Sequence, residues 1–371
     1  MHRFQASRPL TGPFTLTTRH LQPRRRITLV GAHASSHAAC RCQVQPVAAT
    51  HGSIDVDTFR SLAWEPAVPA HLQAFHQLPA IETWFAAEDK ARGLISIGDK
   101  LTSCAHAIVS YELITSSMIS DGESASACAC STSHLRRFQT WLNSQPVGEE
   151  EQDGRLLCTL VDHLLASAAD ADQSRFLQFD APLSLIIQAS RYNQSTDDAS
   201  NRIKQLYIAQ SDIRSLPPSL AEGLPVPDLV TQTGKGDIYS SSIWLGLQPT
   251  YTPLHRDPNP NLFCQLAGSK AVRLLPPRAG LSVFQDVRRR LGSSGSSRIR
   301  GPEMMDGPER EELHRAVWAD GRPGDATAEG EIWQAVLDPG DALFIPQGWW
   351  HSVRSVGPEA ELNASANWWF R

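Results

Sequence analysis

The amino-acid sequence predicts an α+β protein in which a mainly helical region precedes a jelly-roll β-barrel. Two patterns along the chain lead to this fold class. From about residue 54 to residue 183, apolar residues recur at intervals of three and four, which is the spacing of amphipathic helices. From residue 184 to residue 371, short β-branched and aromatic runs alternate with turns that contain glycine or proline, which is typical of a sandwich or jelly-roll. With 371 residues, 41% of them hydrophobic, the chain can bury a sizeable core.

Residues 1–53 form a leader that contains no Asp or Glu, while arginine accumulates in it among Ser, Thr and Ala. This bias is typical of organellar transit peptides, and it leaves a mitochondrial location open. A disordered extension is the alternative interpretation, because Pro9, Pro13 and Pro23 would break an amphipathic helix. Both interpretations stay open.

The helical region, residues 54–183, has its clearest period from Trp64 to Trp84 and from Leu156 to Ala169. Between these two helical stretches, the segment from Ser116 to Ser133 is rich in Ser, Ala and Cys and has no apolar period. We therefore expect an exposed loop there, and we assign no chemistry to it.

The barrel region, residues 184–371, contains short runs that favour strands. They are residues 184–188, 241–245, 262–266, 271–275, 332–336 and 342–345. Residues 277–330 are rich in Arg, Ser and Gly and are interpreted as an insertion between strands, with a short helix at about residues 309–318. Runs of charge are usually solvated faces, so the basic run 288–290 does not make nucleic acid an expected partner.

Composition excludes several classes of protein. A net charge of -5 gives no general attraction to nucleic acid or to an anionic membrane, and no apolar stretch is long and uninterrupted enough to span a bilayer. The seven cysteines include no CxxC pair, which argues against a zinc finger and favours a reducing compartment. We therefore expect an intracellular protein, cytoplasmic or nuclear if the leader is not a transit peptide.

Three residues of the barrel region form a candidate metal site. On an extended chain, residues two apart project to the same side, so His255 and Asp257 would point together into the barrel. A turn at Pro339-Gly-Asp341 and an apolar strand then lead to His351, which delivers a second imidazole. Two histidines and one carboxylate with open remaining positions make the facial triad of non-haem Fe(II) oxygenases.

Polar residues near the first histidine strengthen this interpretation. They are Lys270, fifteen residues after His255, with Thr252 and Asn261 as neutral hydrogen-bonding groups. A keto-diacid that chelates iron through its keto end needs a cation and neutral donors at its far carboxylate. The spacing therefore indicates a site for both a metal and a keto acid.

These motifs resemble the JmjC, or cupin-like, 2-oxoglutarate oxygenases, and among them the small hydroxylase-type members. The resemblance covers roughly residues 184–371. It rests on Thr-Pro-Leu-His-Arg-Asp-Pro at 252–258, Asn-Leu-Phe-Cys-Gln-Leu-Ala-Gly-Ser-Lys at 261–270, Pro-Gly-Asp-Ala-Leu-Phe-Ile-Pro-Gln-Gly-Trp-Trp-His at 339–351 and Asn-Trp-Trp at 367–369.

The resemblance implies a double-stranded β-helix fold and the use of Fe(II), 2-oxoglutarate and O₂. It implies that His255, Asp257 and His351 bind the metal. It implies that Lys270 binds the far carboxylate of 2-oxoglutarate. Supporting contacts to the co-substrate are implied for Thr252, Asn261, Tyr207 and Asn367, and Trp349 and Trp350 are expected to pack around the distal histidine.

Hydroxylation of a protein side chain is the activity that the resemblance favours. N-methyl-lysine demethylation, oxidation of a small molecule and a non-catalytic cupin-like binding module are the alternatives that the motifs leave open. The expected partner is a protein or small-molecule substrate, with homodimerisation implied only by the resemblance.

Overall fold

The structure is a computed structural model that describes residues 44–89, 94–114, 132–145, 151–169, 176–292, 307–319 and 332–371. All of these residues belong to one compact unit, Cys40–Arg371. Residues 116–131 of the predicted loop and most of the predicted leader lie outside the described residues, and Ser133 begins a helix. Within the described residues, no helix is both long enough and apolar enough to cross a lipid bilayer.

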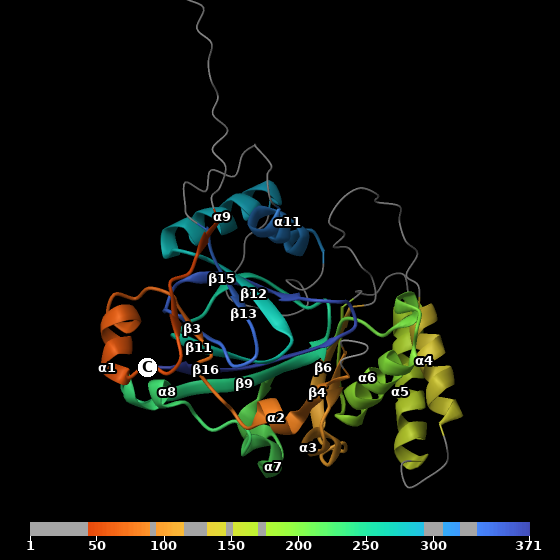
Figure 1. Ribbon diagram of the computed structural model, residues 1–371. Coiled ribbons are helices and arrows are strands. Elements are labelled where there is room, and N and C mark those ends of the chain that lie inside the picture. The colour runs from red at the N-terminus through yellow and green to blue at the C-terminus, as the bar shows by residue number, and fades with distance from the viewer. Residues whose placement is uncertain are drawn as a thin grey trace, which may run out of the picture. The chain divides into compact units, whose positions relative to one another are not determined.

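Two large β-sheets face each other in this unit (Figure 1). The five-stranded sheet has the order β1, β13, β12, β15, β10. Its strands are Val44–Pro46, Ile332–Leu337, Ser269–Leu275, Trp350–Val356 and Tyr251–Arg256, in that order. All neighbours are antiparallel except β1 and β13, which are parallel.

The nine-stranded sheet has the order β2, β3, β14, β11, β16, β9, β8, β6, β7. Its strands are Ala49–His51, Ala70–Gln73, Ala342–Ile345, Asn261–Ala267, Leu362–Phe370, Ile238–Leu247, Leu206–Asp212, Ile108–Ile114 and Phe176–Pro182, in that order. A separate hairpin pairs β4 (Phe85–Asp89) with β5 (Leu94–Ile97). Two antiparallel sheets packed face to face are the arrangement of a jelly-roll, so the predicted fold class is confirmed.

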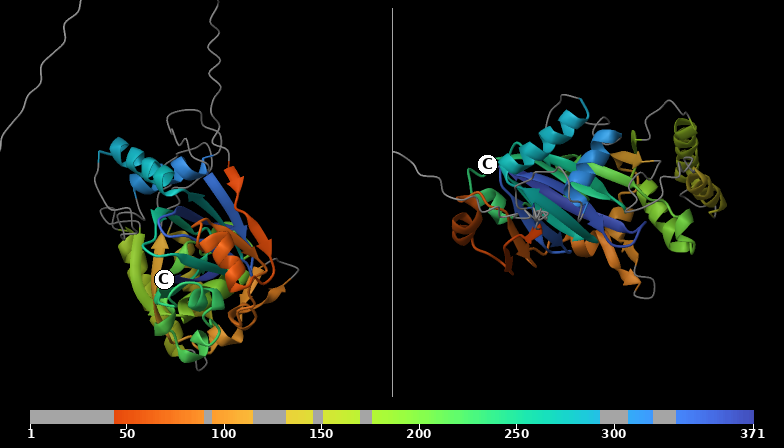
Figure 2. Two further views of the ribbon diagram at one scale, coloured as in Figure 1. Left: turned by 90° about the vertical axis from the view of Figure 1, so that its left-hand side faces the viewer. Right: turned by 90° about the horizontal axis from the view of Figure 1, so that it is seen from above.

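Helices cover the outer faces of both sheets (Figures 1 and 2). Helices α9 (Pro277–Arg290) and α11 (Pro308–Trp318) lie over the five-stranded sheet. The other helices are α1 (Val56–Phe59), the π-helical η1 (Arg60–Trp64), α2 (Ala80–Trp84), α3 (Asp99–Thr102), α4 (Ser133–Ser144), α5 (Glu151–Ala169), α6 (Ser184–Ser195), η2 (Ala199–Asn201), η3 (Ile213–Ser215), α7 (Pro218–Ala221) and α8 (Asp228–Gln232).

Alternation along the strands divides the interior into layers. On β16, Ala364, Ala366 and Trp368 join the apolar core under the helices, while Asn367 and Trp369, on the opposite face, line a pocket. A second apolar cluster fills the space between the sheets, with Phe263 and Leu343 from one sheet and Val272 and Leu274 from the other. The space between the sheets is therefore partly apolar core and partly the polar pocket described below.

Several predicted elements are found where the sequence placed them. They are strands β9, β11, β12, β13 and β14, and helices α5 and α11. Helix α9, also in the predicted insertion, was not predicted. The basic run at its end is not a simple solvated face, because Arg288 is buried in an ion pair of 2.7 Å with Glu309 of α11.

The strand predicted at 184–188 is wrong, because these residues begin helix α6. Eight of its twelve side chains are buried, among them residues 184–187, so the short run predicted as a strand shows no helical period by itself. The single helical stretch predicted from Trp64 to Trp84 is also wrong. Pro66, Pro69 and Pro79 interrupt it, and strand β3 lies between η1 and α2.

Strands from the predicted leader and from the predicted helical region are part of the two large sheets. Strands β6 and β7 belong to the region predicted as mainly helical, yet both extend the nine-stranded sheet. Strands β1 and β2 belong to the predicted leader, and they pair with β13 and β3. The leader prediction is therefore wrong for residues 44–46 and 49–51.

Candidate metal centre

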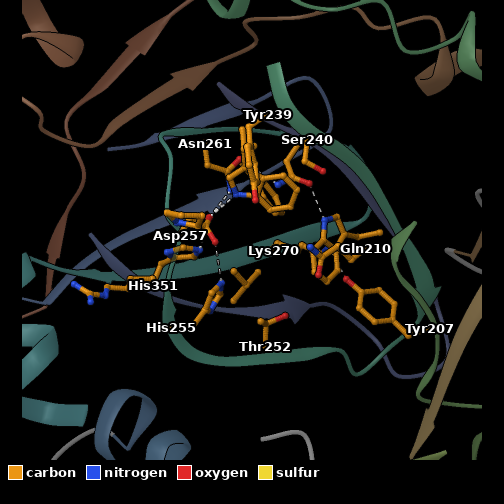
Figure 3. A pocket seen from close by; sticks show the side chains of 17 residues that line it. Tyr207, Gln210, Tyr239, Ser240, Thr252, His255, Asp257, Asn261, Lys270 and His351 are labelled. Atoms are coloured by element: carbon orange, nitrogen blue, oxygen red, sulfur yellow. Dashed lines mark hydrogen bonds and ion pairs between the residues drawn. The ribbon is translucent and has the colours of Figure 1, made fainter. Parts of the chain in front are cut away.

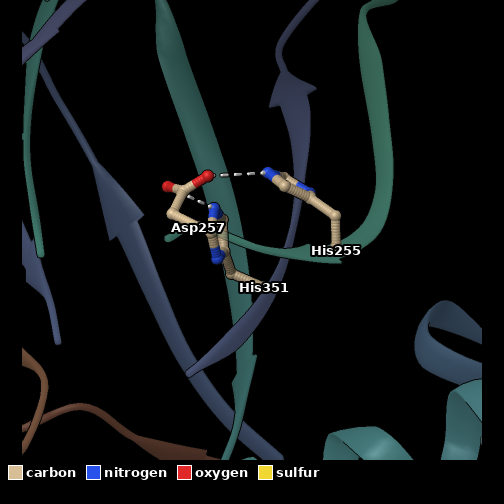
Figure 4. Close-up of side chains that lie close together, drawn as sticks. All are labelled: His255, Asp257 and His351. Atoms are coloured by element: carbon tan, nitrogen blue, oxygen red, sulfur yellow. Dashed lines mark ion pairs between the residues drawn. The ribbon is translucent and has the colours of Figure 1, made fainter. Parts of the chain in front are cut away.

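The three predicted metal ligands come together at the end of β10 and the start of β15. These strands pair antiparallel with His255 opposite His351, after a bulge between Thr252 and His255. Strand β10 ends at Arg256, so Asp257 follows immediately beyond the strand. One ligand atom from each of the three side chains lies within 4.8 Å of the other two. Figure 4 shows the three side chains pointing toward one another.

The two imidazole rings and the carboxylate are close but form no hydrogen bond with one another. Nε2 of His255 lies 3.7 Å from Oδ1 of Asp257, and Nε2 of His351 lies 3.5 Å from Oδ2. The ring centroids of the two histidines are 4.1 Å apart. This spacing leaves room between the three ligand atoms, and the described residues present no other group of this kind.

Backbone carbonyls set the orientation of both imidazoles. Nδ1 of His255 donates to the carbonyl oxygen of Pro253 at 2.8 Å, and Nδ1 of His351 donates to that of Trp349 at 3.4 Å. In each ring Nδ1 is therefore the donor to the backbone, and Nε2 is turned toward the centre. Burial, together with the neighbouring His351, lowers the pKa of His255 to about 4, so this ring is neutral near pH 7.

A chain of hydrogen bonds holds Asp257. Its Oδ2 accepts hydrogen bonds from Nδ2 of Asn261 at 3.0 Å and from Nε1 of Trp369 at 2.7 Å. Asn367 donates to Oδ1 of Asn261 at 3.2 Å, and its own Oδ1 accepts from Nε1 of Trp244 at 2.8 Å. The carboxylate is thus connected to strands β11, β16 and β9 of the opposite sheet.

A pocket of about 430 Å³ opens beside the three ligands, between the two sheets (Figure 3). The pocket brings together all eight residues that the sequence analysis named as candidate metal or co-substrate ligands. It is also lined by Gln210, Tyr239, Ser240, Trp244, Arg256, Pro258, Phe263, Val353 and Trp369. Gln210 and Tyr239 are exposed, so they mark its solvent side.

Lys270 reaches the pocket from β12 and is 1% exposed. Its Nζ donates to Oγ of Ser365 at 2.7 Å and to the hydroxyl of Tyr207 at 3.2 Å. Among the described residues no carboxylate forms an ion pair with it, and burial lowers its pKa to about 7. A buried ammonium without an anionic partner is costly, so this end of the pocket would favour a bound anion.

Thr252 and Tyr207 surround the same end of the pocket. Figure 3 shows Tyr207 on one side of the pocket and the metal ligands on the other, with Lys270 between them. The tyrosine ring fits against Gly246, where a Cβ atom would lie 2.3 Å from Cδ2 of Tyr207. Burial raises the pKa of Tyr207, so its hydroxyl stays protonated and can donate a hydrogen bond.

Asn261 and Asn367 line the pocket and also support Asp257. Their side chains form the series of hydrogen bonds that ends at Asp257. Their contact with a co-substrate stays a prediction.

Trp350 packs behind His351 rather than in the pocket. Its ring meets α9 at Gly280, where a Cβ atom would lie 2.2 Å from the indole, and Arg256 lies over the same ring. Trp349 donates from Nε1 to the carbonyl oxygen of Ala67 at 3.0 Å. The two residues therefore anchor the segment before the distal histidine to neighbouring elements.

Sequence reasoning missed Trp369 and the solvent-side residues. Trp369 stands two residues after Asn367, so alternation along an expected strand would have placed both on one face. Gln210 and Tyr239 lie on β8 and β9 without a motif, and no sequence signal marks them.

Residues 114–371 match the family described as a cupin-like domain. This match starts 70 residues before the predicted barrel, and it includes part of the region predicted as mainly helical. The match therefore includes strand β7, which belongs to the nine-stranded sheet although it precedes the predicted barrel.

Three relatives are similar over part of the chain. A protein of Drosophila melanogaster named Jumonji C domain-containing protein 5 is 30% identical over 165 residues, which cover 44% of this chain and 36% of that protein. Lysine-specific demethylase 8 of Danio rerio is 30% identical, with coverage of 44% and 36%. Lysine-specific demethylase JMJ30 of Arabidopsis thaliana is 26% identical, with coverage of 46% and 35%. The similarity thus spans little more than a third of each relative.

Proposed function

The chain belongs to the cupin-like domain family, and on that premise we propose that it is an Fe(II)- and 2-oxoglutarate-dependent oxygenase. One observation carries the proposal. A single pocket holds a His-Asp-His group at one side and a buried lysine without an ion pair among the described residues at another. A metal and an anion are the two kinds of ligand that these groups would bind.

The donor atoms fit iron. Two imidazole Nε2 atoms and one carboxylate oxygen are the donor types that non-haem iron takes in oxygenases, and the backbone bonds at Nδ1 would keep both Nε2 atoms available to it. The neutral state of His255 removes the need to displace a proton when a metal binds near pH 7. His255, Asp257 and His351 would therefore hold the metal.

The remaining polar residues would hold the co-substrate. Lys270 would pair with the far carboxylate of 2-oxoglutarate, with the hydroxyls of Tyr207 and Thr252 as neutral partners. A carboxylate at this position would favour the charged form of Lys270 and so raise its pKa above about 7. When bound, iron and 2-oxoglutarate would use O₂ to oxidise a C–H bond of the substrate, and succinate and CO₂ would be the other products.

The protein contributes orientation and exclusion of water. Phe263 and Val353 line the pocket with apolar surface, and the sheets enclose the metal ligands, which are at most 12% exposed. A substrate would enter at the solvent side, past Gln210, Tyr239 and Ser240. These three residues would contact the substrate rather than the metal.

For the substrate we propose a protein side chain that becomes hydroxylated, which is the activity that the motif resemblance favours. N-methyl-lysine demethylation is the second candidate, because two of the similar proteins carry the name lysine-specific demethylase. The two reactions share the same pocket residues and differ in product. Hydroxylation leaves oxygen on the substrate, whereas demethylation releases formaldehyde.

Succinate formation tests the proposed oxygenase activity. Purified protein with Fe(II), ascorbate and 2-oxoglutarate should form succinate slowly even without substrate, and the variants His255→Ala and Lys270→Ala should lose it. Lys204→Ala is the matched control, because Lys204 forms an ion pair with Glu359 outside the pocket. Wild-type protein that binds neither iron nor 2-oxoglutarate would support the non-catalytic binding module instead.

Once turnover is established, incubation with candidate peptides separates the two reactions. A gain of one oxygen atom in the peptide supports hydroxylation, whereas formaldehyde with loss of a methyl group supports demethylation.

A further inference from the structure

The two oxygen atoms of Asp257 have different surroundings. Oδ2 accepts two hydrogen bonds, from Trp369 at 2.7 Å and from Asn261 at 3.0 Å. Oδ1 accepts no hydrogen bond from a described residue. Both oxygens lie near a ligand imidazole, Oδ1 at 3.7 Å from Nε2 of His255 and Oδ2 at 3.5 Å from Nε2 of His351, so the hydrogen bonds alone distinguish them. Because a carboxylate oxygen has about two lone-pair sites, the two donors occupy those of Oδ2.

We propose that Trp369 is a positioning residue that, with Asn261, holds Oδ2 of Asp257 so that Oδ1 alone binds the metal. The inference rests on the proposed function only in placing a metal at the three ligands. A carboxylate that bound through both oxygens would take up one further coordination position. Holding Oδ2 would thus keep that position open for the co-substrate or O₂.

Both donors come from directly paired positions of the opposite sheet. Asn261 on β11 is the register partner of Trp369 on β16, so the sheet places the amide and the indole side by side above Asp257. Trp369 is 7% exposed and Asn261 is 2% exposed, so water competes little for these bonds. Two rigid strands therefore fix the carboxylate from one side.

In the series of hydrogen bonds from Trp244 through Asn367 and Asn261 to Asp257, the chemistry of the two end groups fixes the direction of each bond. An indole nitrogen can only donate, so Oδ1 of Asn367 accepts from Trp244 and Nδ2 of Asn367 donates onward to Asn261. The ionised carboxylate of Asp257 can only accept, which requires Nδ2 of Asn261 to face it. Each amide therefore has one consistent orientation, and Oδ2 of Asp257 is the acceptor in both of its hydrogen bonds.

The test uses Trp369→Phe, which keeps an aromatic ring and removes the N–H donor. Its matched control is Trp368→Phe, because Trp368 is the next residue of β16 and faces the apolar core. The metal probe is Co(II), titrated without 2-oxoglutarate and followed by visible absorption. The same titration gives the affinity and the spectrum of the bound ion.

We expect Trp369→Phe to raise the Kd for Co(II) by roughly tenfold and to alter the spectrum, because Oδ2 becomes free to bind the metal. Trp368→Phe should lower the melting temperature yet leave Kd and spectrum unchanged. A purely structural role for Trp369 would make the two variants behave alike. If Trp369→Phe does not fold, Asn261→Ala removes the other donor to the same oxygen and should give the same spectral change.

Failure of this inference can be told apart from failure of the proposed function. If wild-type protein binds Co(II) and neither Trp369→Phe nor Asn261→Ala alters the affinity or the spectrum, the positioning role is overturned while the metal site stands. If the expected shift appears but no succinate forms with Fe(II) and 2-oxoglutarate, the oxygenase proposal fails and the positioning role is supported. Wild-type protein that binds no Co(II) overturns both.

Discussion

Two buried clusters of histidine and aspartate in the described part of the molecule use the same side chains in opposite ways. In one cluster, His71 on β3 donates from Nε2 to Oδ2 of Asp341 at 2.9 Å. Oδ1 of the same aspartate accepts from the backbone N–H of Ala74 at 2.8 Å, and Oδ2 also accepts from that of Asp338 at 3.2 Å. This cluster is closed, because both carboxylate oxygens already have donors.

The metal-ligand cluster is open by comparison. His255 and His351 give their Nδ1 protons to backbone carbonyls, and their Nε2 atoms stay 3.5 Å or more from Asp257. Burial and residue type are nearly the same in both clusters, so neither distinguishes a structural pair from a metal site. What differs is that Nδ1 of His255 and of His351 bonds to a backbone carbonyl, whereas Nε2 of His71 bonds to the carboxylate itself.

The largest expected effect separates the clusters by metal binding. Asp257→Ala should weaken Co(II) binding by roughly 100-fold or more, because it removes a ligand rather than a supporting bond. Asp341→Ala should leave the Kd for Co(II) within about twofold of wild type, because Asp341 binds no metal in this scheme. Titration of both variants checks the prediction, and a comparable loss in the two would show that the closed cluster also controls the metal site.

The second effect reverses the comparison and concerns stability. Asp341→Ala should lower the free energy of unfolding by about 3 kcal/mol, because it leaves His71 and two backbone N–H groups buried without their acceptor. Asp338→Ala, at the exposed start of the same turn, is the control and should cost less than about 1 kcal/mol. Urea denaturation measures both, and equal losses would count against the closed cluster as a structural element.

The smallest effect is a pH dependence of stability from His76, whose Nε2 donates to the backbone carbonyl of Asp341 at 3.1 Å. Burial lowers the pKa of His76 from 6.5 to about 4, so the folded protein keeps this ring neutral where the unfolded chain protonates it. The unfolded state then binds more protons between these values, and stability falls as pH is lowered from 6.5 toward 4.

The variant His76→Gln should therefore flatten the curve of unfolding free energy against pH within this window. Some slope should remain, because burial lowers the pKa of His255 in the same direction. Urea denaturation at several pH values measures the slope for wild type and variant. Identical slopes would show that His76 is protonated equally in the folded and unfolded chains.

By itself, the sequence determined the fold class, the family and the residues that meet at the candidate metal site. Spacing carries this information, because His255 and Asp257 lie two apart at the end of a strand and His351 follows a turn and a short strand. The strands from 241 to 345 were predicted for the same reason, since turn residues bound each of them.

Only the tertiary structure decided which contacts these side chains make. The first four residues of helix α6 are all buried, so the short run at 184–188 could not by itself separate helix from strand. The pairing of His71 with Asp341 joins residues 270 positions apart, and the bond from Trp369 to Asp257 joins residues 112 apart. The first contact depends on the pairing of β3 with β14, and the second on how the two sheets pack face to face. Neither leaves a local pattern in the sequence.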